Sequence, residues 1–226
     1  MDTFYRFVQR VIAGALDLVF PRQCIGCSRE GISLCLECRE SLPEALWDTG
    51  EVKDMYALFD YQDTVVKKMI WHIKYKGNRE LAGIGGEMLY EKIIEFLGDK
   101  IQFGEMKNPL LIPTPISKKR LRERGFNQAA RLVKEILRRD EERFFEADMS
   151  ALRKIKHTAP QTSLGERSER LRNIKGCFLV ASPEKVAKRN IIIIDDVYTT
   201  GGTILEMRRV LKEAGAKNAI AFTIAH

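Results

Sequence analysis

The chain has 226 residues, a net charge of +7, 45% hydrophobic residues and 31% charged residues. This balance is typical of a folded globular protein and excludes global disorder, and the length allows one ordinary domain with a small appendage or two small domains. No apolar run predicts a membrane span, and the charges within the first 21 residues argue against a signal peptide, so we expect a reduced, cytoplasmic protein.

Residues 4–20 carry apolar side chains near helical spacing, and Pro21 ends the helix that they predict within residues 1–22. The apolar face of this helix needs a partner, which is either the rest of the chain or another protein. A cysteine-rich module follows at residues 23–45, and we expect the main domain to occupy residues 50–226.

The main domain alternates strand-like and helix-like segments, which predicts an α/β fold with a parallel sheet covered on both faces. The expected strands are residues 55–61, 110–112, 177–180, 191–194 and 219–224. The expected helices are residues 64–75, 80–97, 128–139 and 203–214.

Positive charge is concentrated in two segments. Residues 118–124 have a net charge of +4 and residues 151–175 have a net charge of +5. Both segments are expected to interrupt the helix and strand patterns. They favour the binding of an anionic ligand, and the alternative is a solvated face with helix termini.

Four cysteines form the pattern C-x2-C-x7-C-x2-C: Cys24, Cys27, Cys35 and Cys38. Each C-x-x-C pair can point two thiolates at one ion, and four thiolates suit a structural zinc ion, so a small zinc ribbon is predicted. Two disulfides and an iron–sulfur cluster are the alternatives. The fifth cysteine, Cys177, lies in an expected strand and is interpreted as a buried apolar residue.

The most informative segment is NIIIIDDVYTTGGTI, residues 190–204. Four isoleucines predict a central parallel strand, and Asp195 and Asp196 follow at its carboxyl end, where ligands bind in open α/β sheets. The next residues form a predicted phosphate cradle at the start of a helix: Thr199, Thr200, Gly201, Gly202 and Thr203. Paired acids before such a cradle suit a phosphorylated sugar. The alternative is a turn in which the aspartates only cap a helix.

The stretch IIIIDDVYTTGGT resembles the phosphoribosyl-pyrophosphate (PRPP) motif of type I phosphoribosyltransferases. Together with the four cysteines, HIKYKGNRELA (residues 72–82), IPTPISKKRLRERGFNQA (residues 112–129) and TAPQ…R…N (residues 158–173), it makes the chain similar to the ComF family of competence-related proteins. The resemblance implies a type I phosphoribosyltransferase-like parallel sheet with flanking helices, preceded by the zinc ribbon.

The resemblance also implies roles for individual residues. Asp195 and Asp196 would be the catalytic acids that contact the ribose hydroxyls, and the cradle would bind the 5′-phosphate. The loop from Pro113 would bind pyrophosphate through Thr114, Arg120 and Arg124. A flexible hood would close over PRPP and includes Gln161, Arg167, Arg170 and Arg172. The implied cofactors are a structural Zn²⁺ and a Mg²⁺ that accompanies PRPP.

The function implied is that of a PRPP-binding protein that handles incoming single-stranded DNA during natural transformation. The alternatives are an active phosphoribosyltransferase of nucleotide salvage or synthesis and a PRPP-sensing regulator. His72, Lys74 and Tyr75 line the acceptor side, or else have a core or surface role. The expected partners are PRPP, single-stranded DNA and other DNA-uptake proteins such as a helicase or channel, at the inner face of the membrane.

Overall fold

The computed structural model describes residues 21–45, 54–156 and 174–226, so the predicted helix over residues 4–20 lies outside the described residues. The chain divides into two compact units, Met1–Leu42 and Pro43–His226. Among the described residues, no helix combines the length and the apolar character that a membrane crossing requires.

The described residues of the first unit contain the cysteine pattern and one short helix. A bridge between Gln23 and Glu30 closes the first cysteine pair into a tight loop. The second pair opens α2 (Leu36–Glu40), which begins directly after Cys35. A 2.8 Å ion pair between Arg29 and Glu37 links the loop to this helix.

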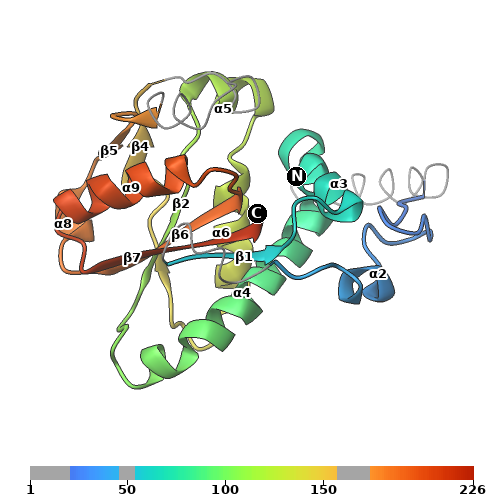
Figure 1. Cartoon of the computed structure of the whole chain (residues 1–226), viewed down its shortest axis with the longest axis horizontal. Coiled ribbons are helices and arrows are strands. Elements are labelled where there is room, and N and C mark those ends of the chain that lie inside the picture. Colours follow the sequence, from blue (N-terminus) through green and yellow to red (C-terminus); the bar gives the residue numbers. More distant parts are fainter. Residues whose placement is uncertain (1–20, 46–53, 157–173) are drawn as a thin grey trace, which may run out of the picture. The chain divides into compact units, whose positions relative to one another are not determined.

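The second unit is built on a five-stranded parallel sheet (Figure 1). Its spatial order is β1 (Met55–Phe59), β7 (Asn218–Ala225), β6 (Asn190–Val197), β2 (Leu110–Pro113) and β3 (Glu146–Ala147). Every neighbouring pair in this sheet is parallel. The predicted α/β fold with a parallel sheet and flanking helices is therefore confirmed.

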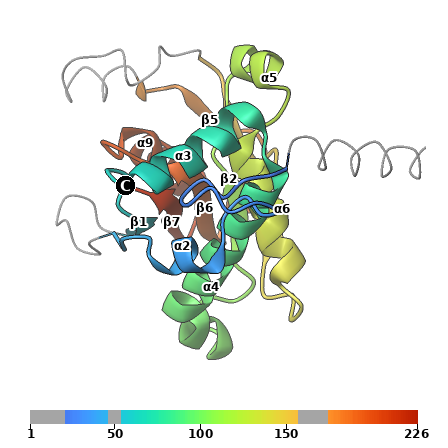
Figure 2. The ribbon, with the colours of Figure 1, turned by 90° about the vertical axis from the view of Figure 1, so that its right-hand side faces the viewer.

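The isoleucines of β6 explain why this strand is central, because residues 191–194 are fully buried. Successive side chains of a strand point to opposite faces. Ile191 and Ile193 pack in one core cluster with residues of α9 (Gly202–Glu213). The other face is covered by α6 (Gln128–Arg139), which contacts β6 and β2, and by α4 (Arg79–Gln102) (Figure 2).

Within the described residues, the four predicted helices of the main domain are present, with differences at two places. Helix α6 begins and ends at the predicted residues, and Asn127 caps its start by accepting a hydrogen bond from the Ala129 N–H at 3.0 Å. Helix α4 continues to Gln102, beyond the predicted end at residue 97. The helix expected over residues 64–75 is instead α3 (Thr64–Trp71) followed by one π-helical turn, η1 (His72–Lys76). Gly77 ends this turn in the left-handed conformation, with φ of 60°.

Three expectations about the basic and strand-like segments were wrong. The segment at residues 118–124 does not interrupt the helices but is itself a helix, α5 (Lys118–Arg124). The strand expected at residues 177–180 is β5 (Phe178–Val180), which lies outside the parallel sheet and pairs antiparallel with β4 (Leu152–Lys154). The basic segment at residues 151–175, which the ComF resemblance equates with the hood, therefore includes a strand, β4. Cys177 directly precedes β5 and is buried, as expected.

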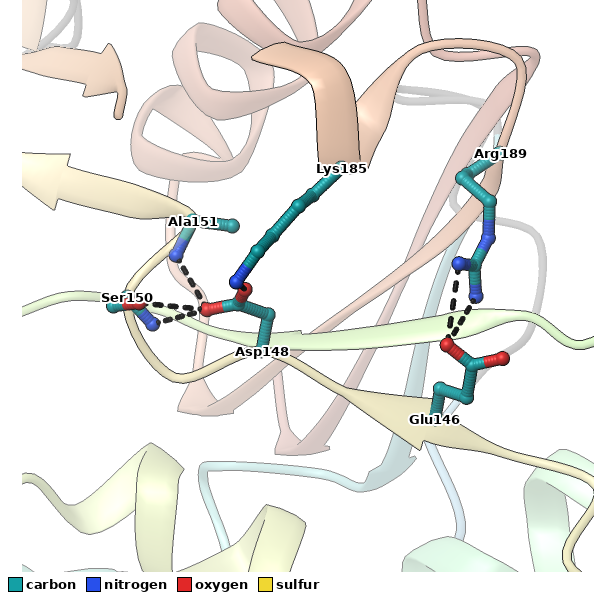
Figure 3. A network of polar contacts seen from close by, with 6 residues as sticks. All are labelled: Glu146, Asp148, Ser150, Ala151, Lys185 and Arg189. Atoms are coloured by element: carbon teal, nitrogen blue, oxygen red, sulfur yellow. Dashed lines mark hydrogen bonds and ion pairs between the residues drawn. The ribbon is translucent and has the colours of Figure 1, made fainter. Parts of the chain in front are cut away.

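A polar network fastens the edge strand β3 to α8 (Pro183–Val186) and the start of β6 (Figure 3). Asp148 accepts hydrogen bonds from the Ser150 and Ala151 N–H groups and from Lys185 Nζ, at 2.7, 2.8 and 2.9 Å. Burial alone would raise its pKa, but these donors outweigh burial and lower the pKa of Asp148 to about 2. Arg189, directly before β6, pairs with Glu146 of β3 at 3.1 Å.

Candidate functional site

Two buried carboxylates stand at the carboxyl end of β6. Asp195 is 8% exposed and Asp196 is 1% exposed. Because strand side chains alternate, Asp195 continues the face that α9 covers and Asp196 continues the face that α4 and α6 cover. Isolated buried carboxylates are costly, so their ionisation depends on nearby cations and donors.

Lys74 supplies the cation for one of the two acids. Its Nζ lies 3.2 Å from Asp196 Oδ1, and its side chain is 18% exposed. The neighbouring acid is less well compensated. Burial and the charge of Asp196 raise the pKa of Asp195 to about 7, against the opposing effect of Lys74. Asp195 therefore takes up a proton much more readily than an exposed aspartate.

The predicted phosphate cradle connects this acid pair to α9. Gly201 has φ of 71° and precedes the helix, which begins at Gly202. Both glycines are buried. The positive end of the helix dipole therefore faces the loop that contains Thr199 and Thr200. The loop therefore lies at the end of a helix where a negative charge is favoured.

The loop after β2 reaches the same edge of the sheet. The Thr114 N–H donates to the Ile194 carbonyl at 2.9 Å, and Asn127 Nδ2 donates to the Thr114 carbonyl at 3.0 Å. These two bonds hold Thr114 directly beside the strand that carries the acid pair. The predicted pyrophosphate loop and the predicted ribose acids are therefore neighbours.

Three buried polar atoms at this edge have no hydrogen-bond partner in the described part of the chain: Thr114 Oγ1, Asp196 Oδ2 and Thr200 Oγ1. They come from three successive parts of the predicted site: the loop after β2, the end of β6 and the cradle. A buried donor or acceptor without a partner costs about 1–3 kcal/mol. Their presence at one edge of the sheet indicates a place for a polar ligand.

The predicted pyrophosphate arginines both lie on α5. Arg124 donates to Gln128 Oε1 at 3.1 Å and lies over the Tyr75 ring, 4.8 Å from its centroid. Burial and the charge of Arg120 lower the pKa of Lys154, which lies on β4, and they outweigh the opposing charge of Asp195. The hood residues Gln161, Arg167, Arg170 and Arg172 lie outside the described residues.

The structure gives two lysines contacts that the sequence did not reveal. Lys74 was expected on the acceptor side or in a core or surface role, and the spacing did not show that a π-helical turn brings it to Asp196. Lys154 was counted only as part of a basic segment. Its position on β4 brings it within electrostatic reach of Arg120 and Asp195.

The four cysteine sulfurs of the first unit lie within 4.8 Å of one another. Cys35 Sγ is 3.7 Å from Cys24 Sγ and 3.6 Å from Cys27 Sγ. Tetrahedral Zn–S bonds of about 2.3 Å place sulfurs about 3.8 Å apart, so the donor set fits zinc. All four thiols are free, so the two-disulfide alternative is not present. Burial opposes ionisation of Cys24, but backbone donors at Cys27, Cys35 and Gly26 outweigh it and lower the pKa of that thiol to about 6.

The order of the strands in the sheet, the acid pair and the glycine cradle together define a type I phosphoribosyltransferase-like domain. A family model described as "Phosphoribosyl transferase domain" matches residues 122–226. This match includes α6, β6, the cradle and β7, and so covers the predicted ribose and phosphate residues.

Individual relatives define the family more closely. Competence protein ComFC of Streptococcus pneumoniae is 30% identical over 214 residues, which span 92% of this chain and 84% of that protein. Competence protein F of Haemophilus influenzae is 29% identical over 237 residues, spanning 100% and 99% of the two chains. DNA utilization protein YhgH of Escherichia coli O6:H1 is 31% identical over 148 residues, spanning 66% and 61%. The chain belongs to the ComF family.

Proposed function

We propose that the chain binds PRPP at the carboxyl edge of its parallel sheet. Asp195 and Asp196 accept hydrogen bonds from the ribose hydroxyls, and residues 199–203 hold the 5′-phosphate. The three buried atoms without partners carry this proposal, because a ribose phosphate supplies hydroxyls and phosphate oxygens that complement a carboxylate and two threonine hydroxyls.

The diphosphate of PRPP is assigned to the loop that begins at Thr114. Arg120, Arg124 and Lys154 give this side of the site its positive charge, and arginine forks suit phosphate oxygens. The unpartnered Asp196 Oδ2 also suits a Mg²⁺ that enters with PRPP. When bound, Mg²⁺ would neutralise diphosphate charge and so favour its departure from the sugar.

In the cell, we propose a role in DNA uptake and in the handling of single-stranded DNA. The support is the names of the relatives, which are competence proteins and DNA utilization proteins, together with the net charge of +7. PRPP binding would then act alongside other uptake proteins, at the cytoplasmic face of the membrane. The cysteine cluster would hold a structural zinc ion, because all four of its donors are protein thiols and none is left for water.

Calorimetric titration with PRPP and Mg²⁺ tests the proposed binding site. We expect Asp195→Asn combined with Asp196→Asn to abolish PRPP binding while the fold is retained. Thr200→Val should weaken binding about tenfold, because it removes one buried hydroxyl partner. The matched control is Asp99→Asn with Glu105→Gln, which neutralises two exposed acids. Unchanged PRPP affinity in the Asp195/Asp196 variant would refute the proposal.

An active phosphoribosyltransferase is the second candidate, and the aromatic rings beside Lys74 favour it. Trp71 and Tyr75 are 46% and 60% exposed, with ring centroids 6.2 Å apart. These rings lie three residues before and one residue after Lys74, which contacts Asp196, and exposed rings suit the stacking of a base acceptor. Pyrophosphate release from PRPP with a panel of nucleobases tests this candidate. PRPP binding without release for any base would leave the uptake role or a PRPP-sensing role.

A further inference from the structure

A cavity of about 500 Å³ lies along α6 and beside the first turn of α4. It is lined by residues of both helices and by Phe126 and Asn127, which precede α6. None of the proposed PRPP contacts lines it. Its volume is in the range of small-molecule sites.

The lining of this cavity is strongly basic. Among the described residues, four cationic side chains line it (Arg79, Arg131, Lys134 and Arg138), and Glu135 is the one carboxylate. Glu135 pairs with Arg138 at 2.7 Å. Within residues 21–45, 54–156 and 174–226, no carboxylate pairs with Arg79, Arg131 or Lys134. The cavity therefore holds three cations without an anionic partner.

Arg131 is held in place before any ligand arrives. Its Nη1 donates to the Gly77 carbonyl at 3.0 Å, and its guanidinium lies 3.5 Å from the centroid of the Phe126 ring. Burial and the charge of Arg79 lower the pKa of Arg131 below its usual range. Two guanidinium groups thus repel each other across a partly buried site, and an anion between them would relieve that repulsion.

We propose that this cavity is a second anion site, separate from the PRPP site, that binds the phosphate group of a nucleotide unit. Arginine forks bind phosphate oxygens in pairs, and a fixed guanidinium loses little freedom on binding. The phosphate belongs either to a free nucleotide or to a nucleic-acid strand. Both sources present the same group to the cavity.

The test compares two charge-neutralising variants. Arg79→Gln with Lys134→Gln removes two exposed cations that line the cavity, and Lys107→Gln with Lys217→Gln removes two exposed cations elsewhere. The probes are thymidine monophosphate, followed by calorimetry, and a labelled thymidine strand of about 20 nucleotides, followed by anisotropy. We expect the Arg79/Lys134 variant to bind at least one probe fivefold or more weakly, and the control variant to stay within twofold of the unaltered chain.

The two probes distinguish the source of the phosphate. If only the monophosphate binds more weakly, the site belongs to a free nucleotide. If the strand binds more weakly, and the slope of its log affinity against log salt falls by about two, the site belongs to nucleic acid. PRPP affinity should stay within twofold in the Arg79/Lys134 variant. Equal behaviour of the two variants with both probes would overturn the proposal, and a loss of PRPP affinity would overturn the separation of the sites.

Discussion

Lys74 Nζ lies 3.2 Å from Asp196 Oδ1, and this ion pair joins the turn after α3 to the end of the central strand. The π-helical turn η1 carries Lys74, and such turns often occur at functional sites. Asp196 is almost fully buried, and a buried carboxylate without a cationic partner is costly. The ion pair therefore fixes the turn η1 against one of the two proposed ribose acids.

Lys74→Met should destabilise the chain by about 3 kcal/mol at pH 7, because it leaves a buried carboxylate without its cation. Combining it with Asp196→Asn should recover at least about 1 kcal/mol, since the unpaired charge is then removed. Urea unfolding of both single variants and the double variant measures the coupling. Additive losses in the double variant would show that the two side chains do not interact.

Asp195→Asn should raise the melting temperature at pH 8. The folded-state pKa of Asp195 is raised to about 7, so the stability that its protonated form provides is complete below about pH 4 and is lost as the pH rises through 7. Asparagine mimics the protonated form, so the melting temperature of the variant should rise by about 2–4 °C or more at pH 8 and hardly change near pH 4. A rise of this size corresponds to roughly 1 kcal/mol. Scanning calorimetry at the two pH values, with Asp99→Asn as the exposed control, measures this. An equal gain at both pH values would contradict the expected proton uptake.

The long elements of the fold were predictable from sequence because each has many residues that repeat one pattern. Helix α6 shows a clear apolar stripe and an asparagine cap, and β6 has four consecutive isoleucines. Shorter elements have no such signal. Strand β3 has two residues and α8 has four, so tertiary contacts define them rather than periodicity.

The acid pair and the cradle were predictable because strand, carboxylates, glycines and helix follow one another without interruption. Lys74 was harder to assign, since its partner is far away in sequence and the π-helical turn shifts its direction relative to an α-helix. The helical form of residues 118–124 was missed because a short, highly charged helix lacks an apolar face. Ser117 caps it, with its Oγ accepting from the Arg120 N–H at 3.3 Å.

Asp148→Asn should weaken the edge of the sheet around β3 in a pH-dependent manner. The pKa of Asp148 is lowered from 3.8 to about 2, so its charged form contributes stability above about pH 4 that is lost as the pH falls to about 2. This lowering of the pKa corresponds to about 2 kcal/mol of folding stability at pH 7. Urea unfolding at pH 7 and near pH 2.5 measures this loss of stability, with Glu146→Gln of β3 as the control. A pH-independent loss would show that the charge of Asp148 is not its source.

Cys35→Ser should release zinc and loosen the first unit. Cys35 Sγ lies within 3.7 Å of two other sulfurs, so its loss leaves an incomplete tetrahedron. A module this small depends on its metal for much of its folding energy. We expect about one zinc ion per chain in the unaltered protein and a large loss in the variant, measured by elemental analysis after dialysis.

Cys177→Ala is the matched control for that loss, because Cys177 is a buried thiol of the second unit and lies outside the cluster. It should retain the full zinc content while lowering stability through a small core cavity. Protease digestion should cut the first unit of the Cys35→Ser variant faster and leave the Cys177→Ala variant protected there. Equal zinc content and equal digestion in both variants would contradict a zinc-dependent first unit.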